Sequence, residues 1–329
     1  MLKRLKIVVA ATIALIIGFF GGTGQVFAQQ DYPTRAIDLV VPFAAGGAGD
    51  TWVRIVMPYL SQKWGVPINV VNRTGGSGAV GVMSVLTAPP DGYTILFDGL
   101  VTPAITAIQS NAPFKWDDTT PIAKFTSAPL AFAVTPDSPW KTFDEAITEL
   151  KKNPETYKAG VGHVGAPAVF ALAKLFETIG IDPTKIPRVI FDGSTPTMAA
   201  LAGKHVAYTA QPLSDTLPLM DAGKLRILAV SSATRVPTAP SLPTGKELGF
   251  PSFDLGTWGV IHGPKNLPPA IVQKWSEGLK EALQNREIID KLAARQTLAD
   301  YLGPEETKAF LAEEYKVRLA IAQRLGLRK

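Results

Sequence analysis

The 329-residue chain contains no cysteine. That absence excludes a disulfide framework, thiolate metal sites and cysteine nucleophiles. Histidine is scarce as well, because His163, His205 and His262 are the only three in the sequence. No two of them have a zinc-binding spacing such as H-x-x-x-H. We therefore expect no metal site. We expect no cofactor either, for the separate reasons given below for the glycine pattern.

A strong excess of one charge is also lacking. The chain has 33 Lys and Arg against 28 Asp and Glu, a net charge of +5. Three of the basic residues, Lys3, Arg4 and Lys6, lie at the very start. Removing these three of the 33 leaves 30 against 28, a net charge of +2. The rest of the chain has no basic cluster with interleaved aromatic residues, so a nucleic acid is not an expected partner.

A long uncharged apolar run, IVVAATIALIIGFF (7–20), follows these basic residues. It is shorter than the roughly 20 residues that a membrane-spanning helix needs. A basic start, an apolar core and small residues ending at Ala28 are typical of a secretory signal peptide. We predict a signal peptide over 1–28, cleaved after Ala28, and export to the periplasm. The alternative is an uncleaved membrane anchor.

Short apolar segments alternate with longer amphipathic ones, which predicts an α/β fold with mostly parallel sheets flanked by helices. The expected strands are 37–43, 68–71, 93–97, 130–136, 158–162, 188–193, 206–211 and 225–232. The expected helices are 51–65, 79–88, 143–154, 166–180, 196–204, 268–283, 286–295 and 304–324.

These elements form two strand–helix–strand sets, which indicates two domains. We expect domain 1 to contain residues 29–127 together with 254–329, and domain 2 to contain 128–253. In open α/β sheets, ligands bind beyond the carboxyl ends of the strands. A cleft between two such sheets is therefore the expected binding site.

The stretch 70–81, VVNRTGGSGAVG, contains the pattern G-x-G-x-x-G at Gly76, Gly78 and Gly81, with Asp98 farther along. Strand, glycine turn, helix and acid together match the dinucleotide-binding fingerprint. However, the turn follows the second expected strand, whereas the fingerprint normally follows the first. In addition, we expect the chain to be exported, and reduced nicotinamide cofactors are kept in the cytoplasm. In the alternative interpretation, the glycines let this loop pass close to a neighbouring strand.

An earlier loop, PFAAGGAGD (42–50), joins strand 37–43 to a helix. Gly46, Gly47 and Gly49 let a ligand approach the backbone closely. Free N–H groups and the positive end of the helix dipole meet at the start of the helix, where they can bind a carboxylate or phosphate. We expect Asp50 to be the N-cap of this helix, a role compatible with ligand contact. The alternative is a tight connection that binds nothing.

Several motifs along the mature chain resemble one family in their order. They are YPTRAIDLVVPFAAGGAGD (32–50), VPINVVNRTGGSGAVG (66–81), PPDGYTILF (89–97), AGKLRILAVSSATR (222–235) and APSLPTGKELGFPSFDLGTWGV (239–260). The family comprises the extracytoplasmic solute-binding proteins of tripartite tricarboxylate transporters, the Bug/TctC family. Its pattern includes P-(F/Y)-x-x-G-G-x-x-D, V-x-N-(R/K)-x-G-(A/G)-x-G-x-x-G and P-D-G-Y-T. The resemblance extends over essentially the whole mature chain.

This resemblance implies a two-domain periplasmic-binding-protein clamshell of the Venus flytrap type. It implies that the protein binds a small carboxylate in the periplasm, acts with the subunits of an integral membrane transporter and performs no chemistry on the ligand. We expect a monomer. A clamshell that presents its ligand to a membrane sensor kinase is the leading alternative, and an exported enzyme that uses the cleft is another.

The resemblance also places residues at the ligand. The first wall would consist of Phe43, Ala44, Ala45, Gly46, Gly47 and Asp50. The family's second-domain loop, S-x-G-(S/T), corresponds to 159–163, so Gly162 and His163 would lie at the second wall, with Ala159 in place of the serine. His163 could instead bond nearby backbone. Gln211 stands where the family usually has an aspartate, which argues against a ligand that bears an ammonium group.

Four further positions are ligand-binding candidates because they follow expected strands or lie near the glycine loop. They are Trp52, Leu100, Thr102 and Asp192. Trp52 either lines the cleft or packs against the sheet, and Thr102 could donate to a ligand oxygen. Asp192 precedes Ser194, and small polar residues before a helix are as often caps as contacts. Apolar residues in these loops suggest a mono- or dicarboxylic acid with few hydroxyl groups.

Overall fold

The structure is a computed structural model that describes residues 32–43, 45–162, 165–191 and 193–328. The predicted signal peptide lies outside these residues. Within the described part of the chain, no helix combines the length and apolar character needed to cross a membrane. One unit, Arg35–Lys329, contains all the described strands and helices.

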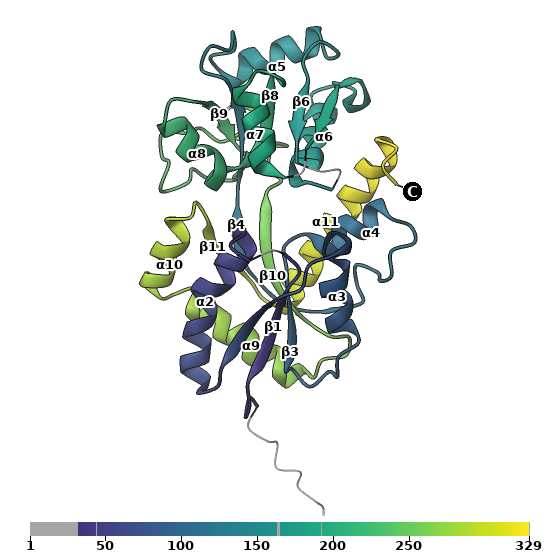
Figure 1. The fold of residues 1–329 in the computed structure, drawn as a ribbon, viewed down its shortest axis with the longest axis vertical. Helices are drawn as coiled ribbons and strands as arrows, with labels where there is room; N and C mark the ends of the chain where they lie inside the picture. The colour runs from purple at the N-terminus through teal and green to yellow at the C-terminus, as the bar shows by residue number, and fades with distance from the viewer. Residues whose placement is uncertain (1–31, 44, 163–164, 192, 329) are drawn as a thin grey trace, which may run out of the picture. The chain divides into compact units, whose positions relative to one another are not determined.

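The first of two sheets has six strands in the order β11-β4-β10-β3-β1-β2 (Figure 1). Its strands are β1 (Ile37–Val41), β2 (Ile68–Asn72), β3 (Thr94–Asp98), β4 (Thr120–Ala128), β10 (Thr257–Gly263) and β11 (Leu298–Leu302). The accompanying helices are α2 (Ala48–Trp64), α3 (Ala79–Leu86), α4 (Val101–Ile108), α9 (Pro269–Ala282), α10 (Arg286–Ala293) and α11 (Pro304–Arg324).

The second sheet has five strands in the order β7-β6-β8-β5-β9. Its strands are β5 (Leu130–Val134), β6 (Ala159–Val161), β7 (Arg188–Ile190), β8 (Tyr208–Pro212) and β9 (Arg226–Val230). Its helices are α5 (Phe143–Lys152), α6 (Pro167–Thr178), α7 (Ser194–Ala202) and α8 (Leu213–Asp221). Strands 1–4, 10 and 11 thus form one sheet and strands 5–9 the other, and this confirms the α/β class with two sheets flanked by helices.

The strand directions differ from the expected mostly parallel arrangement. Strand β1 runs parallel to β2 and β3, but β10 runs antiparallel to both β3 and β4. In the second sheet, β6 is parallel to β7 and β8, whereas β5 is antiparallel to β8 and β9. The chain leaves the first sheet along β4 and enters β5 after Pro129, then returns along β10. The chain leaves the first sheet at the carboxyl end of β4 and re-enters it from that side as β10, so β10 runs antiparallel to β4.

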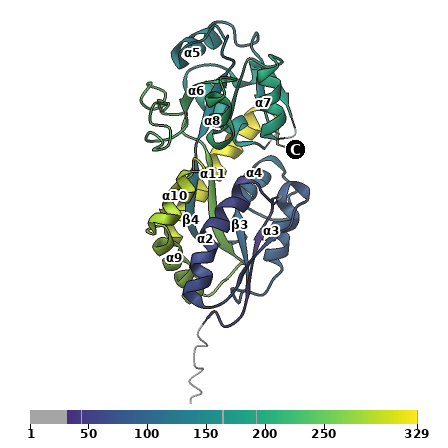
Figure 2. The same cartoon turned by 60° about the vertical axis from the view of Figure 1, so that its left-hand side comes forward.

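Alternating side chains place the helices on the two faces of the first sheet. Val40 of β1 and Leu96 of β3 share a hydrophobic cluster with Val82 of α3 and Val101 of α4. Successive strand residues point to opposite faces, so the neighbours of Val40 face the other side. Figure 2 shows α2 and α3 on either side of these strands. Along the chain, α2 begins shortly after the end of β1, and α4 begins shortly after the end of β3.

Candidate functional site

The loop between β1 and α2 leaves a helix end open. Residues 45–48 are exposed, and α2 begins after Gly47 without a side-chain cap. Its first backbone hydrogen bond runs from the Thr51 N–H to the Gly47 carbonyl. The N–H groups of the first turn have no acceptor within an α-helix, and the helix dipole adds positive potential there. A 17-residue helix that starts in this way offers an anion-binding end.

Asp50 is not the N-cap that the sequence predicts, because α2 begins at Ala48, two residues before Asp50, and its N-cap residue is Gly47. Its carboxylate is 2% exposed. It accepts hydrogen bonds from the Gly46 N–H, from Arg54 Nε and from Asn72 Nδ2, each at 2.9 Å. Burial alone would raise the pKa of Asp50, but these hydrogen bonds and the Arg54 charge outweigh it and lower the pKa to about 2. Asp50 therefore holds the loop from the inside as a carboxylate.

The other residues of the predicted first wall lie around this open end. Ala45, Gly46 and Gly47 are exposed, and Phe43 is half-buried. The Phe43 carbonyl accepts a hydrogen bond of 3.0 Å from Asn72 Nδ2. The exposed residues of the predicted first wall therefore carry no side chain larger than a methyl group. Ala44 lies outside the described residues.

Three other candidates are packed in the interior. Trp52 is 4% exposed, and its ring meets that of Phe97 edge to face at 6.3 Å. Leu100 is 5% exposed and belongs to the main hydrophobic cluster. Thr102 is 1% exposed and its hydroxyl donates to Asp98 rather than to an open surface. The packing interpretation of Trp52 fits this structure, and the expectation that Thr102 donates to a ligand does not.

Asp98 closes the start of α4. It is fully buried and accepts hydrogen bonds from the Val101 N–H at 2.6 Å and the Thr102 N–H at 3.2 Å. The same side chain was the acidic residue of the dinucleotide pattern, so here it is turned inward and is not available to a ribose. The starts of α2 and α4 both follow parallel strands of one sheet. Because Asp98 caps the start of α4 and no side chain caps α2, α2 rather than α4 is the anion-binding candidate of these two helices.

The glycines of the same pattern have structural roles. The turn residues with positive φ are Gly75 at 122°, Gly76 at 54° and Gly78 at 100°. A Cβ at Gly81 would lie 2.8 Å from the Arg73 carbonyl oxygen and 2.8 Å from Pro42 Cβ. The glycines therefore allow the turn and let α3 approach the end of β1. This agrees with the interpretation that the loop passes close to a neighbouring strand.

In the second sheet, two glycines join the loops after β6 and β7. The Gly193 N–H donates to the Gly162 carbonyl at 2.8 Å, and Gly193 has a φ of 103°. Helix α7 starts directly after Gly193 without a side-chain cap. The Ser194 hydroxyl is buried and has no hydrogen-bond partner among the described residues. The sequence pattern leaves Ser194, together with Asp192, as a helix cap or a ligand contact, and its unpartnered hydroxyl makes it a further site candidate. His163 and Asp192 lie outside the described residues.

Gln211 lies within β8 and is 4% exposed. Its side-chain amide donates to Thr209 Oγ1 at 3.2 Å, and that hydroxyl donates to the Gly160 carbonyl at 2.8 Å. Gln211 is thus tied to the strand that precedes the Gly162 loop.

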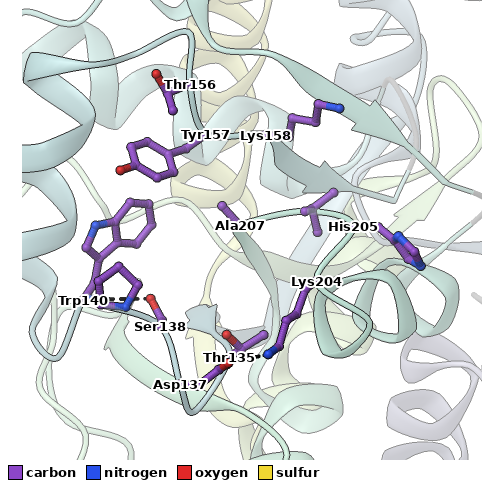
Figure 3. A pocket seen from close by; sticks show the side chains of 12 residues that line it. Thr135, Asp137, Ser138, Trp140, Thr156, Tyr157, Lys158, Lys204, His205 and Ala207 are labelled. Atoms are coloured by element: carbon purple, nitrogen blue, oxygen red, sulfur yellow. Dashed lines mark hydrogen bonds and ion pairs between the residues drawn. The ribbon is translucent and has the colours of Figure 1, made fainter.

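A pocket of about 450 Å³ lies elsewhere in the second sheet (Figure 3). Its lining includes Trp140, Tyr157 and Lys204, and Lys204 pairs with Asp137. These residues follow the end of β5 and precede the starts of β6 and β8. The pocket is therefore at the amino ends of β6 and β8, whereas Gly162 follows the carboxyl end of β6. This pocket is therefore not the anion-binding candidate.

His262 and Asp98 form a buried polar pair next to the start of α4. His262 on β10 is fully buried, and its Nδ1 lies 2.8 Å from Thr119 Oγ1. Its Nε2 lies 3.8 Å from Asp98 Oδ2 and has no hydrogen-bond partner among the described residues. Burial lowers the pKa of His262 from 6.5 to about 3, so the ring is neutral near pH 7. Burial also raises the pKa of Asp98.

We predict that His262 weakens the fold as the pH falls from 6.5 towards 3. In that window the unfolded chain takes up a proton that the folded protein does not, so acid favours unfolding. The slope from this group is at most about 1.4 kcal/mol per pH unit. The raised pKa of Asp98 acts in the opposite direction. Urea unfolding of the wild type and of His262→Gln between pH 4 and 7 measures the effect.

The variant is expected to flatten the acid side of the stability profile, whatever its stability at pH 7. His205→Gln, at an exposed position, is the control for the removal of a histidine. Equal slopes in wild type and His262→Gln would contradict a neutral buried His262.

The two-sheet architecture is found in solved periplasmic binding proteins. MatC from Rhodopseudomonas palustris with bound malate is 25% identical, with a TM-score of 0.72, covering 88% of this chain and 100% of that chain. An R. palustris protein with adipate is 28% identical, with a TM-score of 0.76, covering 90% and 99%. A TctC solute-binding protein from Polaromonas without ligand is 26% identical, with a TM-score of 0.77, covering 89% and 100%. The fold is that of the two-domain periplasmic binding proteins.

The family follows from the sequence comparisons. Residues 53–327 match the model of the tripartite tricarboxylate transporter family receptor, TctC, and the chain belongs to this family. Protein BugT of Bordetella pertussis is 28% identical over 318 residues, which are 94% of this chain and 96% of BugT. The UPF0065 protein in the TAR-I ttuE-ttuC' intergenic region of Agrobacterium vitis is 30% identical over 272 residues, covering 82% and 78%.

Proposed function

We propose that this protein is a periplasmic solute-binding protein that binds a small organic carboxylate and delivers it to a tripartite tricarboxylate-type membrane transporter, without altering it chemically. The observation that carries the proposal is the exposed, uncapped start of α2, beyond a glycine loop whose one acidic residue is turned inward. Two proteins with the same fold are known with malate and with adipate bound.

We further propose that the two sheets correspond to two domains, 29–127 with 254–329 and 128–253, that close on the ligand. The connections β4–β5 and β9–β10 would carry the movement, because they join the sheets. A carboxylate shifts this equilibrium only by its preference for the closed state. In that state we expect the Gly162–Gly193 loops and the Ser194 hydroxyl to supply the second wall.

Backbone N–H groups are the proposed ligand donors in the first wall. Charge-assisted hydrogen bonds contribute about 1.5–3 kcal/mol each. Three apolar residues that follow β3 or lie near the glycine loop, Trp52, Leu100 and Val101, are each at most 5% exposed, so only half-buried Phe43 supports an apolar contact. Gln211 carries no charge with which to pair an ammonium group. We therefore propose a small mono- or dicarboxylate that lacks an amino group.

A thermal-shift screen of the mature protein tests this function. Malate, adipate, monocarboxylic acids, glutamate, NAD⁺ and NADH are compared, and calorimetry follows on any compound that raises Tm. We expect stabilisation by a carboxylate without an amino group, because a ligand that binds only the folded state raises its stability. Stabilisation by the dinucleotides alone, or tight binding of glutamate, would contradict the proposal. N-terminal sequencing of the exported protein should begin at Gln29, and a start at Met1 would refute the predicted signal peptide.

A further inference from the structure

Three side chains form a closed hydrogen-bond network behind the loop before α2. Asp50 and Arg54 lie one turn apart on α2, and Asn72 is the last residue of β2. The Asn72 side-chain amide donates to Asp50 Oδ1 at 2.9 Å, and Arg54 Nη2 donates to Asn72 Oδ1 at 3.2 Å. Arg54 Nε closes the ring by donating to Asp50 Oδ2 at 2.9 Å.

This network holds the loop at two points. Asn72 Nδ2 also donates to the Phe43 carbonyl at 3.0 Å, at the loop's beginning. Asp50 Oδ2 accepts the Gly46 N–H at 2.9 Å, next to the N-cap residue Gly47. Both bonds are made on the inner side, since Asp50 is buried while residues 45–48 are exposed. The network therefore determines the loop shape without occupying the open end of α2.

The network also balances a charge. Asp50 is a negative group in the first turn of α2, where it would repel a bound anion. Arg54 lies against it, with half of its own side chain exposed and the Asp50 side chain only 3% exposed. The pair thus cancels the buried carboxylate's charge close to the proposed ligand, and no lysine or arginine is needed in the first wall itself.

We propose that Asn72 and Arg54 act with Asp50 as positioning residues: Asn72 holds the loop in its ligand-binding shape, and Arg54 cancels the Asp50 charge that would oppose an anion at α2. The proposal rests on the proposed function, since it names the residues that prepare the site for a carboxylate. The loop-holding role can nevertheless be measured without any ligand.

The ligand-free test is hydrogen exchange in wild type, Asn72→Ala and the control Asn69→Ala. Asn69 is in the same strand, and its amide donates to Asp38 at 3.0 Å, away from the loop. We expect exchange of the Gly46 N–H to be about tenfold faster in Asn72→Ala, because its acceptor Asp50 is no longer held. Exchange in Asn69→Ala should match the wild type. Unchanged loop exchange in Asn72→Ala would overturn the positioning role.

The ligand test measures affinity by calorimetry for the carboxylate that stabilises the wild type most in the thermal-shift screen. Asn72→Ala is expected to bind about tenfold more weakly, and Asn69→Ala as the wild type does. A variant that only lowers Tm while keeping the wild-type affinity would show a merely structural role for Asn72, which would overturn the proposal.

Arg54 is tested by Arg54→Met, which keeps the side-chain length without the charge, and by Arg54→Lys. We expect Arg54→Met to weaken carboxylate binding about tenfold at low salt, with a smaller loss at 0.5 M NaCl because salt screens the uncovered Asp50 charge. Arg54→Lys should recover part of the affinity, since it restores the charge without the two-pronged geometry. Wild-type affinity in Arg54→Met at low salt would overturn the charge-balancing role.

The two proposals fail in different ways. If no carboxylate stabilises the wild type, the proposed function fails, and faster Gly46 exchange in Asn72→Ala would still support the loop-holding network. If carboxylates bind the wild type, Asn72→Ala and Arg54→Met equally well, the function stands and the positioning role fails.

Discussion

Replacing Ala48 with aspartate is expected to abolish carboxylate binding while leaving the ligand-free protein at least as stable as the wild type. Ala48 is the exposed first residue of α2. A carboxylate in the first turn stabilises a helix by about 0.3–1 kcal/mol. The same charge about 4 Å from a bound carboxylate repels it by roughly 4 kcal/mol at an effective dielectric constant of 20. Affinity should therefore fall on the order of 100-fold or more.

Ala48→Asn is the matched control, because asparagine has nearly the same shape as aspartate but carries no charge. It should keep most of the affinity, and calorimetry together with urea unfolding measures both properties in the two variants. Wild-type affinity in Ala48→Asp would place the anion somewhere other than at α2. An equal loss in Ala48→Asn would mean that the residue's size, not the helix-end electrostatics, blocks the ligand.

Replacing Gly81 with alanine is expected to destabilise the protein by about 1–2 kcal/mol, against the usual trend for helices. Alanine ordinarily favours a helix by about 1 kcal/mol over glycine. Here the new Cβ would lie 2.8 Å from the Arg73 carbonyl oxygen and from Pro42 Cβ, and neither group is a flexible side-chain end. Overpacking of this kind costs about 1–3 kcal/mol. We expect the cost of forcing α3 away from the end of β1 to lie in the upper part of that range, which exceeds the roughly 1 kcal/mol that alanine gains as a helix former.

Urea unfolding measures this change, and Val80→Ala is the control. Val80 lies on the same helix and is 53% exposed, so its substitution should change stability by no more than about 0.5 kcal/mol. A Gly81→Ala variant as stable as the wild type would show that the close approach of α3 to β1 is not required. The glycine pattern would then lack its structural explanation.

Elements with strong local signals were predicted well. The helix expected over 304–324 corresponds to α11, and the helix expected over 79–88 to α3, because periodic apolar residues and terminal prolines define them locally. Elements that depend on distant partners were missed or misjudged. Strand β10 contains Gly259 and Gly263 and becomes a strand by pairing with both β3 and β4. Its antiparallel direction follows from the path of the chain between the sheets.

The candidate site divides in the same way. The glycine loop before a helix, and its suitability for an anion, were readable because turn and helix start are adjacent in the sequence. The inward direction of the Asp50 side chain was not, because Asn72 approaches it from the next strand, 22 positions away. Nor did the pattern show that Trp52 packs against Phe97 of β3.

By itself the sequence determined the α/β class, the two glycine turns and the family, since these depend on local periodicity, on backbone freedom at glycine and on motif order. Only the tertiary structure decided which helix start remains open. Asp50 and Asp98 both precede or begin a helix after a parallel strand, yet Asp98 caps α4 while Asp50 is drawn to Asn72 and Arg54. A carboxylate bonds to the donors that folding brings within reach, and some of those donors come from other strands.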